Sequence, residues 1–329
     1  MAVIVDRGGD VSGDRRGQPP EPGWDRVDYR VERDGLTRRQ MMLGGGALVV
    51  AGVAGAAWAE HARVVRAVDR FIAGRQGGPI PPASDALVVY RTFHSTVLGH
   101  DVAYGIALPP GTELGAPLPV AFCLPGRGGA PHDVFDGLHL PDFLAQVVGG
   151  GARPFALAAV DGGESYWHRR ASGEDRMAML VDEFVPLCHR EYKLGGGKDR
   201  QAGMGWSMGG YGVLLAAETY PRLFAAVTAG GPAVWPSYQD MMNGPGDAFD
   251  SAADFAAHDV IGHAGRLAGT PVRIDCGTVD PFYPYVKQLA PRLPAGDTVH
   301  YGFGGHATAF WRTVAAQQLR FVARHLAAA

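Results

Sequence analysis

The sequence contains little lysine, little cysteine and no excess of basic charge, and each shortage argues against a class of protein. Only three of the 30 basic residues are lysine, and the formal net charge is −3. Because there is no basic stripe interleaved with aromatic residues, nucleic acid is not expected as a partner. The 329 residues are 47% apolar and 19% charged. They therefore predict a folded chain with a substantial core, in one large α/β domain or two small ones.

The cysteines are three in number and show no C-x-x-C spacing. Neither a zinc site nor a disulfide framework is therefore expected. Cys123 and Cys276 lie in apolar, strand-like runs, where buried free thiols are expected. One disulfide among Cys123, Cys188 and Cys276 remains an open alternative.

The amino-terminal segment is predicted to lie outside the fold. Residues 1–36 mix Gly, Pro, Arg and Asp without periodicity and are predicted to be disordered. Within residues 37–59, the pair Arg38-Arg39 precedes a moderately apolar, glycine-rich stretch. This arrangement resembles a twin-arginine export signal. Residues 60–85 are predicted to form a connector to the folded domain.

The export segment has two interpretations. Ala57-Trp58-Ala59 offers a small-x-small cleavage site, so the signal could be removed. Alternatively, residues 41–58 approach the ~20 residues that a membrane span needs and could remain as an uncleaved anchor. Both interpretations predict export to the cell envelope or beyond it, and the second adds association with a membrane.

Residues 86–329 alternate strand-like and helix-like patterns. Two runs around Gly99-His100 predict an antiparallel pair, and later apolar runs are continuous, as in strands buried on both faces. Predicted strands cover residues 86–93, 102–108, 119–124, 155–160, 223–227, 271–276 and 298–301, and predicted helices cover 175–192, 210–218 and 310–326. The alternation predicts an α/β domain with a mostly parallel, doubly wound sheet. Residues 231–270 are predicted to form an insertion with a small helical cap over the site.

The pentapeptide Gly205-Trp206-Ser207-Met208-Gly209 is the strongest functional motif in the chain. G-x-S-x-G is a weak pattern by itself, because 48 of the residues are glycine. Here, however, it lies between a short apolar run and a predicted helix. A sharp strand-to-helix turn of this kind exposes a nucleophilic serine above the sheet. Ser207 is therefore the candidate nucleophile.

A serine nucleophile needs a base to take its proton and an acid to orient that base. In α/β-hydrolases the acid and then the histidine follow the serine. Asp280 and His306 lie in loops that leave two predicted strands, at the edge where sites of open α/β sheets are found. Asp275 and His300 are the alternatives, but both fall within predicted strands, so Asp280 and His306 are preferred.

An oxyanion hole needs two backbone N–H donors aimed at the reacting oxygen. Met208 directly follows the candidate nucleophile and should supply one of them. The glycine-rich turn of residues 124–129 should supply the other, with Arg127 as the candidate donor through its main chain. A phosphate-binding loop is the alternative for this turn, but no G-K-[ST] follows it.

Four aromatic residues near the predicted strand ends are candidates for substrate contacts. Tyr166 and Trp167 belong to an aromatic and basic loop after the run 155–160, and Trp206 and Phe282 flank Ser207 and Asp280 in sequence. A structural role in the core or in a solvated loop is an equally open interpretation for each of them.

Four motifs together resemble the "putative esterase" family of α/β-hydrolases, which includes S-formylglutathione hydrolase, feruloyl esterases and the antigen 85 mycolyltransferases. The motifs are residues 124–129, 205–210, 276–280 and 305–311. The resemblance covers about residues 86–329 and implies an α/β-hydrolase fold, and a residue-Gly-X turn in that family implies that Arg127 donates to the oxyanion hole. Trp206 stands where the mycolyltransferases carry leucine, which argues against trehalose mycolylation.

The sequence therefore predicts a serine esterase that acts through an acyl-enzyme on a small-molecule or lipid ester, with no metal or organic cofactor. Transfer of the acyl group to a sugar or lipid alcohol is the alternative within the same chemistry. A non-catalytic envelope-binding protein on a hydrolase scaffold is a third and weaker hypothesis, because all three triad positions are filled.

Overall fold

The computed structural model describes residues 3–4 and 78–327 of the chain. The predicted export segment, the connector up to residue 77 and most of the predicted disordered segment lie outside these residues, so the expectations for them stay predictions. Within the described residues, no helix is both long and apolar enough to cross a membrane.

The described residues form one nine-stranded sheet with the strand order β1-β2-β3-β5-β4-β6-β7-β8-β9. The strands are β1 (Val3–Ile4), β2 (Leu87–Ser95), β3 (His100–Leu108), β4 (Val120–Leu124), β5 (Ala156–Val160), β6 (Gln201–Trp206), β7 (Val227–Gly230), β8 (Val272–Gly277) and β9 (Thr298–Gly302). β3 runs antiparallel to both of its neighbours, β2 and β5. Along the sheet from β5 through β4, β6, β7 and β8 to β9, every neighbouring pair is parallel, as the continuous apolar runs predict.

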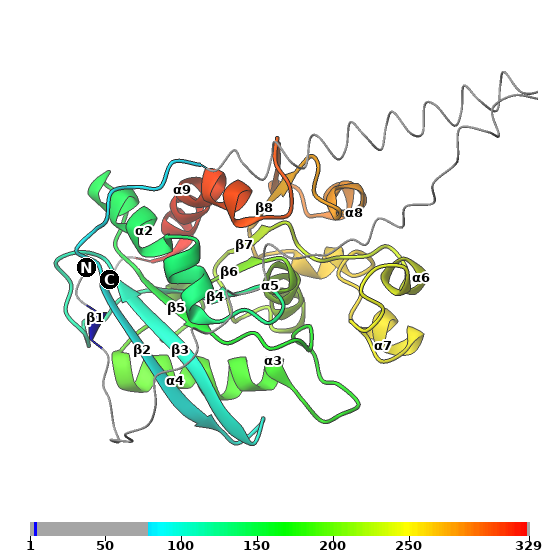
Figure 1. The fold of residues 1–329 in the computed structure, drawn as a ribbon, viewed down its shortest axis with the longest axis horizontal. Helices are drawn as coiled ribbons and strands as arrows, with labels where there is room; N and C mark the ends of the chain where they lie inside the picture. The colour runs from blue at the N-terminus through cyan, green and yellow to red at the C-terminus, as the bar shows by residue number, and fades with distance from the viewer. Residues whose placement is uncertain (1–2, 5–77, 328–329) are drawn as a thin grey trace, which may run out of the picture. The chain divides into compact units, whose positions relative to one another are not determined.

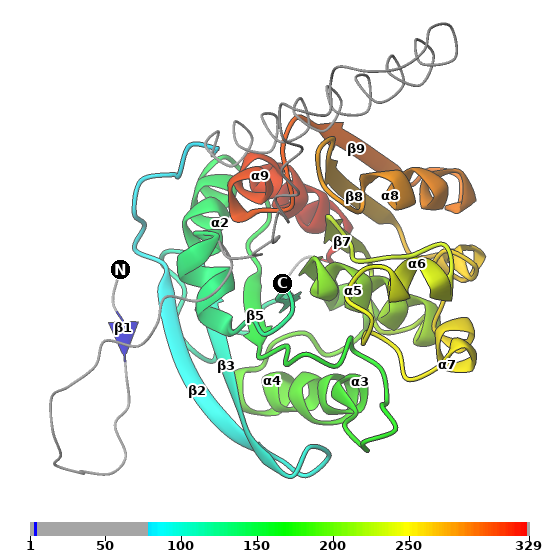
Figure 2. The same cartoon turned by 45° about the vertical axis from the view of Figure 1, so that its right-hand side comes forward.

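Helices cover both faces of the sheet, which is the doubly wound arrangement (Figures 1 and 2). The larger helical segments are α2 (Leu140–Gly149), α3 (Arg176–Ala178), a π-helical turn (Met179–Phe184), α4 (Val185–Tyr192), α5 (Met208–Thr219), α8 (Tyr283–Leu289) and α9 (Thr308–His325). All five β4 residues are buried, and they alternate between two cores. Phe122 and Leu124 pack with α3 to α5, whereas Ala121 and Cys123 pack with α2 and α9.

One strand boundary differs from the prediction. β7 begins at Val227, whereas the apolar run predicted a strand over 223–227. Leu223 and Phe224 are buried in the core, and the Leu223 amide donates to the Tyr220 carbonyl in a turn after α5. Core burial, and not strand pairing, therefore accounts for the apolar character of the first part of this run.

The insertion of residues 231–270 contains two short helices, α6 (Tyr238–Met242) and α7 (Ala252–Ala257). Each begins after a serine whose side chain accepts a hydrogen bond from an amide in the first turn. Ser237 caps α6 and Ser251 caps α7 in this way. Such caps satisfy amides that a helix leaves without internal partners. The insertion thus contains short helices, and their role as a cap over the site stays a prediction.

All three cysteines are buried and carry free thiols. Burial raises the pKa of the Cys123 and Cys276 thiols well above the ordinary value. The expectation of buried free thiols is confirmed, and the alternative of one disulfide among the three does not hold.

Glu218 in α5 is expected to make the protein less stable as the pH rises. It is 7% exposed, neither carboxyl oxygen has a hydrogen-bond partner among the described residues, and burial raises its pKa from 4.5 to about 8. The unfolded chain releases this proton near pH 4.5, whereas the folded chain retains it to about pH 8. The free energy of unfolding should therefore fall across this window, by up to about 1.4 kcal/mol per pH unit.

Urea unfolding of Glu218→Gln at several pH values measures this effect. The variant should be more stable than the parent near pH 8, and the difference should vanish well below pH 4.5, where the carboxyl group is protonated in both the folded and the unfolded chain. Glu191→Gln on the exposed end of α4 is the matched control and should leave the pH dependence unchanged. A constant difference across the window would contradict the assignment.

Candidate active site

Ser207 lies at the turn between β6 and α5. Its backbone has φ 56° and ψ −119°, a left-handed conformation that costs a non-glycine residue about 1–3 kcal/mol. Two hydrogen bonds hold the turn, from the Ser207 amide to the Gly230 carbonyl and from the Ala233 amide to the Ser207 carbonyl. The strained turn therefore matches the sharp strand-to-helix geometry that the pentapeptide predicts.

The two glycines of the pentapeptide are required by close backbone contacts. A Cβ atom on Gly205 would overlap the Gly209 carbonyl, and one on Gly209 would overlap the Leu124 carbonyl at the end of β4. The start of α5 is thereby packed directly against the turn that follows β4. Any side chain at either position would push Ser207 out of place.

Gly209→Ala is expected to lower the free energy of unfolding by more than about 2 kcal/mol, because backbone atoms and not flexible side chains fill the space. Urea denaturation measures the loss. Gly265→Ala is the control, since a Cβ there meets no atom within 4 Å. Equal stability of the two variants would show that the turn tolerates a side chain.

His306 connects Ser207 to Asp280. Its Nε2 lies 2.7 Å from Ser207 Oγ and its Nδ1 lies 2.8 Å from Asp280 Oδ2. Because a carboxylate only accepts hydrogen bonds, the ring proton belongs on Nδ1, which leaves the Nε2 lone pair facing the serine hydroxyl. Asp280 is buried, whereas part of the His306 side chain is exposed. The structure thus brings the three predicted residues together in one hydrogen-bonded chain.

The loops that carry Asp280 and His306 meet because they follow neighbouring parallel strands. After β8, the Thr278 and Val279 amides donate to the Gly302 and Gly304 carbonyls after β9, at 2.8 and 3.0 Å. The second carboxyl oxygen of Asp280 accepts from the Phe282 amide at 2.8 Å. These contacts hold the Asp280 carboxylate in position beside the His306 imidazole.

Asp275, the alternative acid, has a structural environment. Its side chain is fully buried within β8 and accepts two hydrogen bonds from Arg273 and one from Gln318. His300, the alternative histidine, lies 3.3 Å from this same carboxylate. Neither Asp275 nor His300 belongs to the chain of hydrogen bonds that leads to Ser207, which agrees with the choice of Asp280 and His306.

The Met208 and Arg127 amides belong to two segments that are in close backbone contact. The close approach of Gly209 to the Leu124 and Pro125 carbonyls sets the turn of residues 124–129 against the first turn of α5. Among the described residues, neither the Met208 amide nor the Arg127 amide donates to a backbone carbonyl. Both N–H groups therefore lack a backbone acceptor, and their role as oxyanion donors stays a prediction.

The Arg127 side chain ties three segments together. Its guanidinium donates to both carboxyl oxygens of Asp247 in the insertion, at 2.8 and 2.6 Å, and to Glu164 after β5 at 3.1 Å. It also lies 5.9 Å from the centre of the Tyr166 ring. The pair holds the pKa of Asp247 below its usual range. Arg127 thus connects the turn after β4 to the insertion.

The four aromatic candidates occupy different environments. Trp167 is fully buried against Gly212 of α5, and Trp206 is 2% exposed against Gly230, so neither side chain offers surface to a substrate in this conformation. Tyr166 is 5% exposed and packs on Trp235. Of the four, only Phe282 is both partly exposed and in contact with His306, with the two ring centres 5.2 Å apart.

Two further residues shape the site and were not among the predicted ones. Trp235 of the insertion lies between the rings of Tyr166 and Phe282, at 5.6 and 5.4 Å. Gly231 has φ 51°, and a Cβ there would lie 2.6 Å from Asp280 Oδ2 and 3.2 Å from His306 Nδ1. The Gly230-Gly231 pair after a strand was the available signal for a close backbone approach.

Comparison with protein families matches residues 95–318, more than half of the chain, to the family described as "Putative esterase". The chain belongs to this family. The protein is a carboxylic ester hydrolase, and its fold is the α/β-hydrolase fold expected from the sequence. Comparison with curated proteins finds no match for this esterase.

Three solved structures share the fold at low sequence identity. A ferulic acid esterase is 21% identical, covers 73% of this esterase and 99% of its own chain, and superposes with a TM-score of 0.65. An S-formylglutathione hydrolase from Agrobacterium tumefaciens is 18% identical over 74% and 97% of the two chains, with a TM-score of 0.61. Mycobacterium tuberculosis MPT51 (FbpC1) is 16% identical over 72% and 99%, with a TM-score of 0.58.

Proposed function

We propose that this esterase cleaves its substrate through a covalent acyl-enzyme formed on Ser207. The observation that carries the proposal is the chain of hydrogen bonds from Ser207 Oγ through His306 to the buried Asp280 carboxylate. A serine hydroxyl is a weak nucleophile until a base in contact with it takes its proton. His306 Nε2 is at hydrogen-bonding distance for that transfer.

In the first half-reaction, Ser207 Oγ attacks the ester carbonyl carbon while its proton passes to His306 Nε2. The carbonyl oxygen becomes an oxyanion, which the Met208 and Arg127 amides are proposed to stabilise. Collapse of this intermediate breaks the bond to the alcohol oxygen, and His306 returns the proton to the leaving alcohol. The products of this stage are the free alcohol and the acyl ester of Ser207.

In the second half-reaction, water attacks the acyl carbonyl while His306 takes a proton from it. The same two amides stabilise the second oxyanion, and the carboxylic acid leaves as His306 protonates Ser207 Oγ. Asp280 keeps the His306 proton on Nδ1 and stabilises the imidazolium in both stages. The cycle regenerates the enzyme without a cofactor.

The alternative acceptor is a sugar or lipid alcohol in place of water, which makes the protein an acyltransferase with the same first half-reaction. Product analysis in the presence of a competing alcohol separates the two. An excess of alkyl ester over free acid would favour transfer, and free acid as the main product would favour hydrolysis.

Fluorophosphonate labelling tests the nucleophile directly. The wild-type protein should gain one covalent adduct by intact-mass measurement, and peptide mapping should place it on Ser207. Ser207→Ala should not label, whereas Ser172→Ala, which changes an exposed loop serine, should label as the parent does. Absence of an adduct on the folded wild-type protein would favour the non-catalytic binding protein instead.

A further inference from the structure

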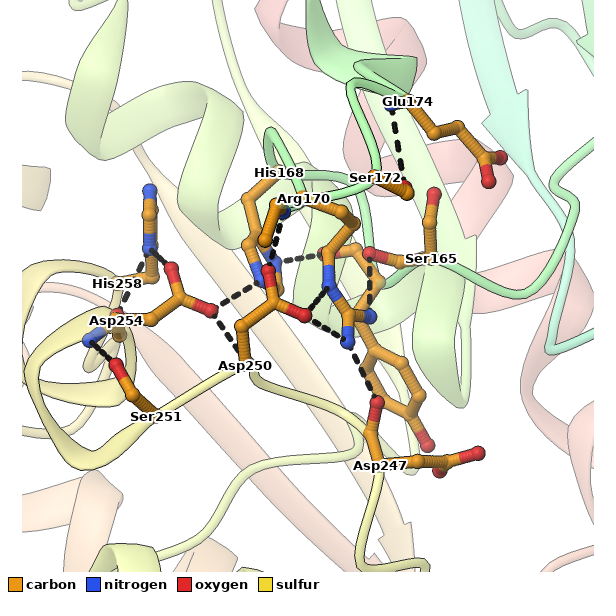
Figure 3. A network of polar contacts seen from close by, with 12 residues as sticks. Ser165, His168, Arg170, Ser172, Glu174, Asp247, Asp250, Ser251, Asp254 and His258 are labelled. Carbon is orange, nitrogen blue, oxygen red and sulfur yellow. Dashed lines mark hydrogen bonds and ion pairs between the residues drawn. The ribbon is translucent and has the colours of Figure 1, made fainter.

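Three side chains outside the triad gather at the junction between the insertion and the core. They are His168 in the loop after β5, Asp254 in α7 and His258 at the end of α7 (Figure 3). One potential ligand atom from each residue lies within 4.8 Å of those of the other two. Asp254 and His258 are four residues apart, which places them on the same side of the helix.

His168 has an acceptor at each of its two ring nitrogens. Nδ1 lies 2.9 Å from the Tyr166 carbonyl oxygen, and Nε2 lies 3.2 Å from Asp254 Oδ2. A neutral imidazole carries only one N–H, so it can donate to only one of these oxygens. His168 is 2% exposed, so solvent has little access to either contact.

We propose that His168, Asp254 and His258 bind one divalent transition-metal ion, of which zinc fits the ligand set best. An ion bound by both His168 Nε2 and Asp254 would explain why a carboxylate lies beside this nitrogen. Nδ1 then donates to the Tyr166 carbonyl, which is the usual way a backbone oxygen fixes the tautomer of a metal-bound histidine.

Two of the separations between the ligand atoms, each to a different oxygen of Asp254, are close to those of a tetrahedral site. Bonds of about 2.0–2.1 Å to zinc place neighbouring ligands roughly 3.3 Å apart. His168 Nε2 is 3.2 Å from Asp254 Oδ2, and His258 Nδ1 is 2.9 Å from Asp254 Oδ1. His258 Nδ1 also contacts the Asp254 main-chain oxygen at 2.9 Å and would exchange that contact for the ion.

The chemistry of the donors favours zinc over calcium or magnesium. Two imidazoles and one carboxylate suit zinc and related transition metals, whereas calcium and magnesium prefer oxygen ligands only. Two neutral imidazoles and one carboxylate leave a divalent ion with one net positive charge. The cysteine spacing argued against zinc, but these ligands include no cysteine.

Neighbouring groups already hold the three ligands in place. The Asp250 amide donates to Asp254 Oδ2 at 2.8 Å. The Tyr211 hydroxyl of α5 donates to the His258 carbonyl at 3.1 Å, and Phe249 stacks on His168 with the ring centres 5.0 Å apart. The ion would therefore fasten α7 to the loop after β5 and leave the Ser207 chemistry to the triad.

Metal titration of the untagged, chelator-dialysed protein tests the proposal. Zinc should bind with one saturable equivalent by calorimetry and raise the midpoint of thermal unfolding, and cobalt should give the absorption of a tetrahedral site. Asp254→Asn and the partly exposed His258→Gln should each weaken binding by more than about 100-fold, the upper loss found when outer contacts of a metal site are removed.

His132→Gln is the matched control, because His132 forms an exposed ion pair with Asp136 and should leave zinc binding unchanged. Retention of wild-type affinity in His258→Gln would overturn the proposal even if Asp254→Asn does not fold. Failure of the wild-type protein to bind one equivalent would also overturn it. An NMR spectrum of the ring nitrogens that shows His168 doubly protonated at neutral pH in the presence of zinc would overturn it as well. The hydrogen bonds of a charged imidazole would then explain both contacts without a metal ion.

Discussion

Ser207→Ala is expected to lower kcat for a short p-nitrophenyl ester by roughly 10⁶-fold, as loss of the nucleophile does in other serine hydrolases. Without Oγ no acyl-enzyme can form, and His306 has no hydroxyl to activate. Alanine retains the backbone turn at φ 56°, and the removed oxygen contacts only His306 among the described side chains. The free energy of unfolding should therefore stay close to that of the parent.

The two measurements together distinguish a chemical role from a structural one. Steady-state kinetics gives the loss of turnover, and urea unfolding gives the stability of the same preparation. The Ser172→Ala variant should match the parent in both. A Ser207→Ala variant that is fully folded and still turns over the ester would overturn the nucleophile assignment.

Asp280→Asn is expected to lower kcat by roughly 10⁴-fold, the loss found when the acid of a serine triad becomes an amide. The amide would no longer hold the proton on His306 Nδ1, so the wrong tautomer would face Ser207. The imidazolium formed during the reaction would also lose its counter-charge. Because the side chain keeps its size, the loss should appear in kcat and much less in stability.

Asp275→Asn is the matched control, because Asp275 is a second buried carboxylate and lies within β8, just before the loop that carries Asp280. Its partners are Arg273 and Gln318, so its loss should reduce the free energy of unfolding and leave kcat of the folded fraction close to that of the parent. Comparison of the two variants therefore separates the acid that orients His306 from the one that supports the sheet. The opposite pattern would exchange their roles.

The sequence predicted the elements of the site because each catalytic candidate follows a strand. Parallel neighbours such as β8 and β9 end at the same edge of the sheet, so Asp280 and His306 had to lie near each other and near the turn after β6. The order of the motifs predicts which residue has which role. The parallel strands were predictable because burial on both faces of the sheet leaves a continuous apolar run in the sequence. The large helices were predictable because their apolar residues recur at helical spacing.

Side-chain burial in the loop after β5 could not be predicted from the sequence. Tyr166 and Trp167 are adjacent aromatic residues, and both adopt a left-handed backbone, with φ 58° and 56°. This turn sends Trp167 into the core beneath α5, where Gly212 leaves room for its ring. Residue types alone do not reveal such a turn, so a substrate contact and a core contact looked alike.

Contacts between distant loops were equally hidden. His168 and Asp254 are 86 positions apart, and the insertion that carries Asp254 has no pattern that fixes where it folds back. The same holds for Trp235, whose place between Tyr166 and Phe282 depends on that path. Only the three-dimensional course of the insertion brings these groups to the site.

If its amide is the proposed oxyanion donor, Arg127 would couple the choice of substrate to the rate of reaction. Its amide is the proposed oxyanion donor, and its guanidinium holds Asp247 of the insertion through two hydrogen bonds. An ester that displaced the insertion on binding would separate this pair, and the displacement would reach the amide of Arg127. Such an ester would lose transition-state stabilisation as it binds. The enzyme would therefore reject poorly fitting esters through slow turnover as well as through weak binding.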